Sequence, residues 1–451
     1  MFSELVVTLA LVAATIAVVG RLNRCPSDSK PLVQVVVLGD IGHSPRMQYH
    51  ALGLAQQGKV LVELIGFPGS KPIPELSKNS SIIIRHIRPI HISPRLKVPF
   101  VVYAILKVVW ESLQLLGLLL FTRYRPEVIM VQTPPAVPCM AVAALISKLT
   151  GSRLVVDFHN ITYMHLGSKV KTPALLWAVR MYEQIVSRLA TVSFCVTKSM
   201  AEFLRDSFRI SRVYTLYDKP GPQFVGRTSP VARTDLEHRL KALGIMNTPF
   251  TAYDFIAVSS TSWTKDEDFG LVLQALPEYS RATAEKKTLL FITGKGELRD
   301  EFISKFNALD LKNIDLVTAW VPAADYPLVL GCANFGISVH TSTSGLDLPM
   351  KVVDMLGSEL PVIAVNFPAL KELLGAADEG GLTFSTGAEL ASCMQKLTVD
   401  VDATKNRDRL SAFGAKWRRQ TFKSEWMSVV WPVLEPMILP PSRQARKRME
   451  Q

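Results

Sequence analysis

A loop of small and polar residues is followed by a lysine and an aspartate at a defined spacing in the carboxyl-terminal half of the chain. Leu348 and Pro349 open a predicted helix, and the first backbone N–H groups of a helix attract anions. Lys351 adds a positive charge in the first turn. Asp354 lies on the same helical face and can accept hydrogen bonds from both hydroxyls of a ribose. The pattern predicts a nucleoside-diphosphate site, and an ordinary surface lysine–aspartate pair is the alternative. The loop residues expected to line this site are Ser344, Gly345 and Leu346.

Four further residues in the same half follow predicted strands and are expected to face the same ligand. Lys265 can reach a diphosphate. Gly294 and Gly296 allow backbone to approach a ligand closely. Trp320 can border a nucleobase. A solvated lysine, a plain turn and a core tryptophan are the respective alternatives.

Two predicted strand ends in the amino-terminal half carry residues suited to acid–base chemistry. Asp40 and His43 lie in GDIGHS, and Asp157 and His159 lie in DFHN. Histidine, with an ordinary pKa of about 6.5, suits general-base catalysis at neutral pH, worth roughly 10²–10⁴-fold in rate. We predict His43 as the base, with His159 as its rival and either aspartate as the group that orients the imidazole. A helix cap or a phosphate contact is the alternative for His43.

Gly42, Arg46 and Tyr49 surround His43 on the turn and the helix that follows. Arginine and tyrosine can both donate hydrogen bonds to a diphosphate. We expect these three residues to contact the acceptor, and the alternative for the two helical residues is a position that faces solvent.

Metal-binding patterns are weak in this sequence. The Asp-x-Asp spacing occurs at 266–268, interpreted as the acidic start of a helix, and at 400–402, in a polar stretch without a preceding strand. A helix start and Lys351 can neutralise a diphosphate electrostatically. We expect no metal site and no tightly bound cofactor, with Mg²⁺ at most loosely associated with the substrate.

Alternating strand-like and helix-like segments predict an α/β fold with two Rossmann-like, doubly wound domains that face a cleft. The predicted boundaries are 31–218 for the acceptor domain, 219–250 for a Pro- and Gly-rich linker and hinge, 251–422 for the donor domain, and 423–451 for a helix and basic tail. Strands are predicted at 33–39, 60–66, 128–132, 153–157, 191–196 and 213–217, and again at 255–260, 288–293, 314–318, 335–340 and 361–365.

Two apolar segments predict membrane association. Residues 1–30 contain an apolar run long enough to span a bilayer, followed by basic residues, which predicts a single-pass signal-anchor with the rest of the chain in the cytosol. Residues 98–121 carry Lys107, Glu111 and Gln114 on one narrow face of a predicted helix. We predict that this helix lies on the membrane, with a buried core helix as the alternative.

The composition limits the class of protein. Of the 451 residues, 48% are hydrophobic, which excludes a disordered chain. The net charge of +12 suits anionic partners such as diphosphates and acidic lipids. The basic residues are scattered and form no nucleic-acid-binding motif, so no nucleic-acid partner is expected.

Four motifs together resemble GT-B glycosyltransferases, and within them the mannosyltransferases that act on dolichol-linked acceptors. The motifs are GDIGHSPRMQYHALGLA at 39–55, DFHN at 157–160, SSTSWTKDEDF at 259–269 and TSTSGLDLPMKVVDM at 341–355. The family commonly has a glutamate at each end of a seven-residue spacer, whereas Asp347 and Asp354 have six residues between them, and Glu359 stands where glycine is common.

The resemblance covers nearly the whole chain, and it implies a reaction and a location. It implies inverting transfer of the first mannose from GDP-mannose to GlcNAc2-diphosphate-dolichol for N-glycosylation. The place would be the endoplasmic reticulum membrane, with the catalytic domains on the cytosolic face and other lipid-linked oligosaccharide mannosyltransferases as candidate partners. The alternatives are a UDP-GlcNAc-dependent transferase on the same lipid and a non-catalytic membrane-anchored scaffold that recruits other transferases.

Overall fold

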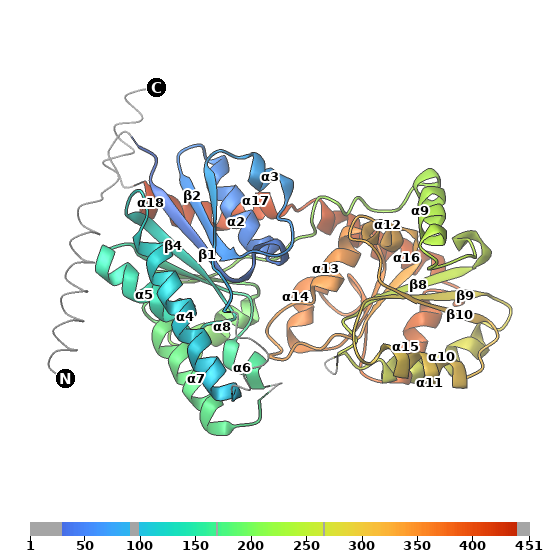
Figure 1. The fold of residues 1–451 in the computed structure, drawn as a ribbon. Coiled ribbons are helices and arrows are strands. Elements are labelled where there is room, and N and C mark those ends of the chain that lie inside the picture. Colours follow the sequence, from blue (N-terminus) through green and yellow to red (C-terminus); the bar gives the residue numbers. More distant parts are fainter. Residues whose placement is uncertain (1–28, 91–98, 168–169, 265–266, 440–451) are drawn as a thin grey trace. The chain divides into compact units, whose positions relative to one another are not determined.

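A computed structural model describes residues 29–90, 99–167, 170–264 and 267–439 (Figure 1). The described residues divide into two compact units, one formed by the chain up to Tyr217 and from Lys423 on, the other by Asp218–Phe422. Nearly all of the predicted anchor at 1–30 lies outside the described residues, as do Lys265 and the end of the predicted basic tail.

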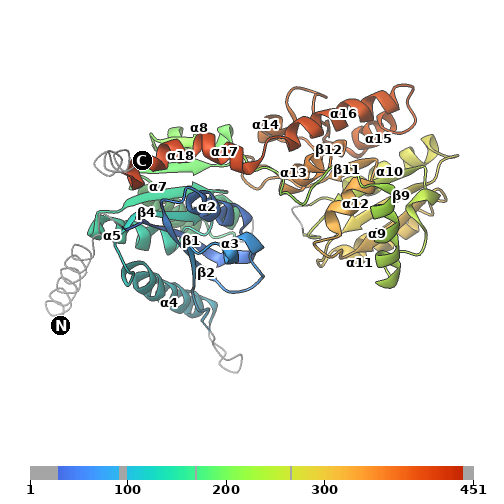
Figure 2. The ribbon, with the colours of Figure 1, turned by 90° about the horizontal axis from the view of Figure 1, so that it is seen from above.

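The first unit is built on a parallel sheet of seven strands in the order β3-β2-β1-β4-β5-β6-β7. Apolar runs such as LVQVVVL in β1 form its centre because both faces of a parallel sheet are covered by helices. Figure 2 shows α2 and α4 on opposite faces of this sheet. The strands are β1 (Leu32–Asp40), β2 (Leu61–Phe67), β3 (Ile82–His86), β4 (Pro126–Thr133), β5 (Arg153–Phe158), β6 (Val192–Cys195) and β7 (Val213–Thr215).

The helices of this unit include two from the carboxyl-terminal end of the chain. The unit contains η1 (Ile41–His43), α2 (Pro45–Gln56), α3 (Pro74–Lys78), α4 (Phe100–Leu120), α5 (Cys139–Thr150), α6 (Thr162–Gly167), α7 (Pro173–Ser187), α8 (Lys198–Asp206), α17 (Phe422–Val429) and α18 (Trp431–Ile438). Trp426 of α17 is buried against α2, where any side chain larger than that of Gly53 would meet the indole ring. The segment from 423 to 439 therefore completes the first unit.

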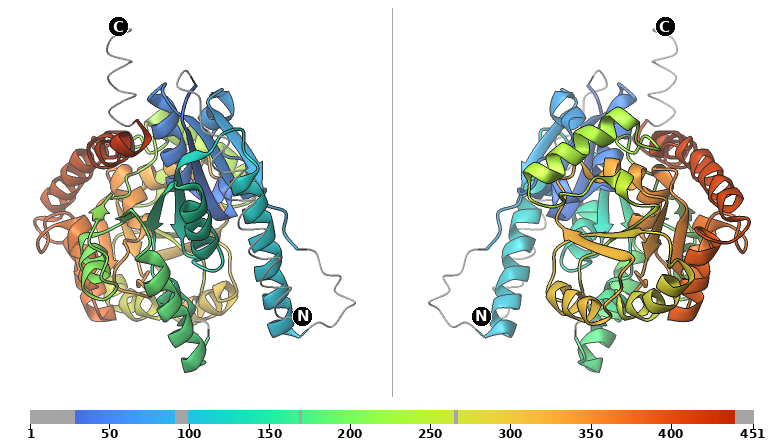
Figure 3. Two further views of the ribbon diagram at one scale, coloured as in Figure 1. Left: turned by 90° about the vertical axis from the view of Figure 1, so that its left-hand side faces the viewer. Right: turned by 90° about the vertical axis from the view of Figure 1, so that its right-hand side faces the viewer.

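Helix α4 turns its apolar side outward. The side chains of Val102, Ile105, Leu106, Val109, Trp110 and Leu113 are 41–60% exposed. By contrast, Glu111 is buried and lies 3.7 Å from Lys107, and the Gln114 amide hydrogen-bonds both backbone groups of Arg88 at 2.8 Å. The predicted polar face is therefore the one that packs on the protein, and the helix stands at the flank of its unit (Figure 3).

The length and hydropathy of α4 would suffice for a membrane span from Val102 to Leu120. The strands on either side of it belong to one sheet, however, since β3 pairs with β2 and β4 pairs with β1. A span would separate those strands, so α4 does not cross a bilayer within this fold. Only 17% of its apolar window is buried, which also distinguishes α4 from a core helix of its unit.

The second unit has a parallel sheet of six strands in the order β10-β9-β8-β11-β12-β13. Its strands are β8 (Phe255–Ser260), β9 (Thr288–Thr293), β10 (Ile314–Ala319), β11 (Phe335–Ser338), β12 (Val362–Val365) and β13 (Leu382–Phe384). Its helices are α9 (Pro230–Ala242), η2 (Phe250–Ala252), α10 (Gly270–Ala282), α11 (Arg299–Ala308), α12 (Tyr326–Cys332), α13 (Met350–Gly357), η3 (Pro368–Leu370), α14 (Lys371–Leu374), α15 (Gly387–Lys396) and α16 (Ala403–Arg418). The two parallel sheets confirm the predicted pair of Rossmann-like folds.

The predicted linker at 219–250 is wrong in its central part, because α9 is helical and packs on α12. Ser229 caps this helix by accepting a hydrogen bond from the Ala232 N–H, and Pro230 occupies its first position. Only Leu236 and Leu240 of α9 are buried. Such a narrow apolar stripe produces little periodicity, and the prolines that suggested a linker include the one that begins the helix.

Candidate active site

His43 and Asp40 form a hydrogen-bonded pair where β1 meets η1. His43 Nδ1 lies 2.7 Å from Asp40 Oδ2, and the imidazole is 78% exposed. Backbone N–H groups of Ser70 and Gly42 each donate to the Asp40 carboxylate at 2.9 Å, and these bonds, that from Ser70 above all, lower the pKa of Asp40. Since Asp40 is ionised, the proton of a neutral His43 lies on Nδ1, and Nε2 is left as an acceptor.

The loop after β2 completes this pair through a residue that the sequence pattern does not single out. The Ser70 hydroxyl lies 3.2 Å from His43 Nδ1 and 3.3 Å from His43 Nε2, in addition to the bond from the Ser70 N–H to Asp40. Gly42 is required because a Cβ there would lie 2.3 Å from the Ser70 carbonyl oxygen. The only sequence signal for Ser70 is its place just beyond β2, the neighbour of β1.

Asp157, at the end of β5, is buried and accepts hydrogen bonds from three side chains. Arg46 holds both carboxylate oxygens, at 2.8 and 2.9 Å. His50 Nε2 and His159 Nε2 lie 3.1 and 2.9 Å from Asp157 Oδ2. Burial opposes ionisation of Asp157, but Arg46 and the two histidines together hold its pKa well below the usual range. His159 is thus oriented by a carboxylate, as the sequence predicts, and that carboxylate is already paired with an arginine.

The structure gives Arg46 a role different from the predicted contact with an acceptor diphosphate. Its guanidinium is buried, and besides Asp157 it donates to the Leu216 carbonyl at 2.7 Å. Arg46 therefore joins α2, β5 and the segment after β7. Tyr49, on the same helix, is half-buried.

Lys351 and Asp354 both lie on α13, but they have different surroundings. Lys351 pairs with Glu267, a buried carboxylate that also accepts from the Thr261 hydroxyl at 2.7 Å and from the Ser262 N–H at 2.6 Å. Glu267 thereby fixes the lysine to the loop that follows β8. The sequence interpretation of 266–268 as an acidic helix start misses this role of Glu267.

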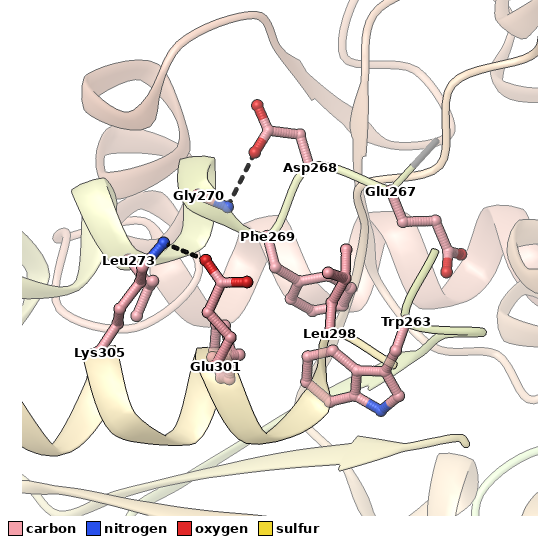
Figure 4. Close-up of a pocket in the computed structure, with 10 residues that line it drawn as sticks. Trp263, Glu267, Asp268, Phe269, Gly270, Leu273, Leu298, Glu301 and Lys305 are labelled. Atoms are coloured by element: carbon pink, nitrogen blue, oxygen red, sulfur yellow. Dashed lines mark hydrogen bonds and ion pairs between the residues drawn. The ribbon is translucent and has the colours of Figure 1, made fainter. Parts of the chain in front are cut away.

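Figure 4 shows that the carboxylates of Glu267 and Asp268 point apart. Asp268 Oδ1 accepts from the Gly270 N–H at 2.9 Å at the start of α10, as expected for a helix start. Asp268 lines a depression of about 360 Å³ together with Trp263, Phe269, Glu301 and Lys305. Asp266 lies outside the described residues. Among those that are described, no group of three or more His, Cys, Asp or Glu side chains is placed to hold a metal ion.

Asp354 is a carboxyl group held next to a tyrosine. Its side chain hydrogen-bonds to Tyr326, and burial raises the pKa of Asp354 to about 7. The Tyr326 hydroxyl also lies 2.8 Å from the Ser260 hydroxyl at the end of β8. A carboxyl group with this pKa changes its protonation state near neutral pH. A ligand whose hydroxyl groups donate to the carboxylate would shift that protonation equilibrium toward the ionised form.

The loop before α13 is folded on itself. The Gly345 and Leu346 N–H groups donate to the hydroxyls of Ser342 and Ser344, at 2.8 and 3.2 Å. Both hydroxyls in turn donate to Asp347. Asp347 therefore closes the loop, and Gly345 adopts φ +70°, which favours glycine at this turn.

The remaining predicted donor residues follow β9 and β10. A Cβ at Gly294 or Gly296 would lie 1.8 or 2.0 Å from the carbonyl oxygens of Thr261 or Ser262, so these glycines allow two loops to touch. Trp320 is 60% exposed, and the Lys295 ammonium lies 4.9 Å from its ring centroid. Trp320 is therefore a surface aromatic at a strand end and not a core residue.

Solved structures with the same architecture include glycosyltransferases. A glycosyltransferase from Rickettsia africae aligns with a TM-score of 0.61 at 14% identity, over 92% of this chain and 100% of that chain. Anabaena Alr3699/HepE in complex with UDP-glucose gives 0.61 at 14% identity, over 89% and 99%. A family profile described as "Glycosyl transferase 4-like domain" matches residues 47–216. The chain therefore has the GT-B fold of glycosyltransferases.

Comparison with curated proteins narrows this class. The human chitobiosyldiphosphodolichol beta-mannosyltransferase is 40% identical over 81% of this chain and 84% of its own length. The Yarrowia lipolytica protein of the same name is 35% identical over 95% and 93%. An Arabidopsis thaliana relative named UDP-glycosyltransferase TURAN is 36% identical over 79% and 86%. The chain belongs to the chitobiosyldiphosphodolichol beta-mannosyltransferase family.

Proposed function

We propose that this chain transfers mannose from GDP-mannose to the terminal sugar of GlcNAc2-diphosphate-dolichol, in a β-1,4 linkage and with inversion, during the assembly of lipid-linked oligosaccharide for N-glycosylation. Relatives named chitobiosyldiphosphodolichol beta-mannosyltransferase align with most of the chain, and their name supports both the acceptor and mannose as the transferred sugar. The use of a nucleotide-sugar donor is supported by two residues of α13. Lys351 is a cation held in place by Glu267, and Asp354 is a carboxyl group whose pKa burial raises to about 7.

On the donor side, Lys351 supplies charge to the diphosphate and Asp354 accepts from the ribose hydroxyls. Glu267 sets the position of the lysine, so that little side-chain conformational entropy is lost when the ligand binds. Trp320 offers an exposed ring for the guanine to stack on.

On the acceptor side, His43 is the general base. The Asp40 carboxylate beside it is held by backbone N–H groups, and a protonated His43 would be the cation that pairs with it. The carboxylate beside His159 is already neutralised by Arg46. Because the carboxylate beside His159 already has Arg46 as its partner, we assign the base to His43, and His159 serves as a hydrogen-bonding contact for substrate.

The reaction follows from these roles. His43 Nε2 takes the proton of the acceptor hydroxyl as that oxygen bonds to C1 of mannose. The bond from C1 to the phosphate oxygen breaks on the opposite side, and GDP leaves with both electrons. Lys351 and the start of α13 stabilise the charge that develops on the leaving diphosphate. This assignment requires no tightly bound cofactor, and any Mg²⁺ would be loosely associated with the diphosphate.

We also propose that the chain is a single-pass protein of the endoplasmic reticulum membrane with both units on the cytosolic face. The outward apolar side of α4 supports a resting place on the lipid surface, near a lipid-linked acceptor. Other transferases that extend the same lipid are candidate partners on that surface.

A reconstituted assay tests the proposal. Purified full-length protein is given a synthetic chitobiosyl-diphosphate lipid and radiolabelled GDP-mannose, UDP-GlcNAc or UDP-glucose, each with and without a chelator. Transfer from GDP-mannose, with a product sensitive to β-mannosidase, is expected. Transfer from a UDP-sugar alone would favour the alternative donor suggested by the name of the Arabidopsis relative. Absence of transfer from every donor would favour a scaffold.

A further inference from the structure

A line of hydrogen bonds joins the carboxyl-terminal helix α17 to the end of β5. The Trp426 indole N–H donates to His50 Nδ1 at 2.9 Å. His50 Nε2 lies 3.1 Å from Asp157 Oδ2, which is also 2.9 Å from His159 Nε2. Trp426, His50 and Asp157 are buried, whereas His159 is partly exposed.

The chemistry of these groups fixes where the protons lie. An indole nitrogen can only donate, so His50 Nδ1 must accept and the His50 proton must lie on Nε2. Burial lowers the pKa of His50, which keeps the ring neutral despite the nearby carboxylate. His50 therefore donates to Asp157. Asp157 is ionised, so its carboxylate oxygens can only accept hydrogen bonds. His159 must therefore also present an N–H to Asp157, which places a His159 proton on Nε2.

We infer that Trp426 and His50 are positioning residues for His159. They hold Asp157 in the position from which it accepts from His159 Nε2, so that His159 offers the lone pair of Nδ1 to a ligand hydroxyl. If His50 took its other tautomer, an unprotonated Nε2 would face the Asp157 oxygen and repel it. The position of Asp157, and with it the direction of His159, would then depend on Arg46 alone. This inference rests on the proposed function only in assigning His159 to the substrate site.

Gly53 keeps the indole in place. A Cβ at that position of α2 would lie 2.7 Å from the fused carbons of the Trp426 ring. The ring therefore packs directly on the backbone one turn beyond His50, and the donor N–H has little freedom to move away.

The test separates a positioning role from a structural one. Full-length protein in detergent micelles is labelled with ¹⁵N in its histidine rings, and the tautomer of each ring is read from its two nitrogen shifts. The variants are Trp426→Phe, which removes the donor and keeps most of the bulk, His50→Leu, which removes both ring nitrogens, and His50→Gln, whose amide can accept from the indole and donate to Asp157.

In the unsubstituted protein, His50 is expected as a neutral ring protonated on Nε2, and His159 is expected to hold a proton on Nε2. Trp426→Phe should introduce the second tautomer at His50 and shift the His159 signals. Trp426→Phe and His50→Leu should lower kcat by about three- to tenfold, the worth of one neutral hydrogen bond, with the Kd for GDP unchanged. His50→Gln should restore both the His159 shifts and kcat.

A His50 ring protonated on Nδ1 in the unsubstituted protein would overturn the inference, as would unchanged His159 shifts in both Trp426→Phe and His50→Leu. The NMR result does not depend on turnover. If the unsubstituted protein transferred no sugar, the proposed function would be wrong, but the nitrogen shifts of His50 and His159 would still test whether Trp426 and His50 position His159.

Discussion

Lys351 of α13 is held by Glu267, a buried carboxylate that lies 84 positions earlier in the chain. The pair joins the helix that carries the predicted nucleotide contacts to the loop after β8. It keeps the lysine in place before any ligand arrives, and Glu267 relies on the lysine for its neutralising charge.

Replacing Lys351 by methionine should affect both binding and stability. Glu267 would remain buried without its cation, which should lower the free energy of unfolding by about 1–3 kcal/mol. The Kd for GDP, measured by calorimetry, should rise about tenfold or more, since a charge-assisted contact to the diphosphate is lost. Lys305→Met is the matched control, because Lys305 pairs with Glu301 where both side chains are exposed. Its effect on stability should stay below about 1 kcal/mol. Equal GDP affinity in Lys351→Met and the unsubstituted protein would contradict this role for Lys351.

Removal of the proposed base should abolish turnover and spare donor binding. His43→Ala should lower kcat by roughly 10²–10⁴-fold with an unchanged Kd for GDP. Asp40→Asn, which leaves the imidazole without its carboxylate partner, should give a smaller loss. His238→Ala on exposed α9 serves as the control. If His43→Ala turned over normally while His159→Ala did not, the two histidines would have to exchange roles.

The carboxyl group of Asp354 predicts that nucleotide binding depends on pH. Its pKa is raised to about 7 by burial, so the folded protein binds a proton here that the unfolded chain has already lost above the ordinary value of 3.8. The resulting contribution to stability is fully present at low pH and is lost as pH rises through 7. Ribose binding has the opposite dependence, because only the carboxylate accepts from both hydroxyls.

GDP affinity should therefore increase from pH 6 to pH 8, with proton release that calorimetry detects as a dependence of the heat on buffer ionisation. Asp354→Asn and the ligand 2′-deoxy-GDP should each reduce that dependence, and Asp268→Asn should leave it intact. A flat pH profile for GDP would show that Asp354 does not contact the ribose.

The exposed side of α4 should control attachment to lipid when the predicted anchor is absent. A chain without residues 1–28 should bind vesicles that contain acidic phospholipid, and Ile105→Glu with Leu113→Glu should release it, since both side chains point outward. Val401→Glu, a single change of the same kind at an exposed valine of the second unit, should have no effect in the same sedimentation assay. Retained binding by the α4 variant would mean that another surface makes the attachment.

The cytosolic location can be tested at the Asn79-Ser80-Ser81 sequon. Asn79 lies in a turn at the surface, where its side chain accepts from the Ser81 N–H at 3.0 Å. A lumenal unit would present this sequon to the glycosylation machinery. The native protein should therefore show no mobility shift on endoglycosidase treatment, and Asn79→Gln should migrate with it.

All the central strands of the two sheets were predicted from sequence, because continuous apolar runs mark them, and the edge strands β7 and β10 were predicted as well. The ranges 255–260 and 288–293 match β8 and β9 at both ends. The edge strands β3 and β13 were missed. Ile83 of β3 is exposed, and β13 has three residues, so neither shows a buried run. The helix α9 was missed because few of its residues are apolar.

Candidate site residues could be predicted from sequence where they lie together in a short motif at the end of a strand. The pairing of His43 with Asp40 needs only their closeness in sequence. Ser70, Glu267 and Tyr326 were not predicted as site residues, because they reach the site from loops and helices that the fold alone brings near. Arg46 was misjudged because its ion pair with Asp157 spans 111 positions, a separation at which sequence patterns say nothing about contacts.

The return of the chain to its first unit has a consequence for biosynthesis. Residues 423–439 are synthesised after the whole second unit. The surface of α2 around Gly53 therefore lacks its contact with Trp426 until the end of translation. A polypeptide that stopped before residue 423, through a premature stop codon or proteolysis, would retain every strand of both sheets. It would nevertheless lack Trp426, and His50 Nδ1 would lose the indole N–H that donates to it. Quality control would therefore meet such truncated products as incompletely packed proteins, even though the predicted substrate contacts are all still encoded.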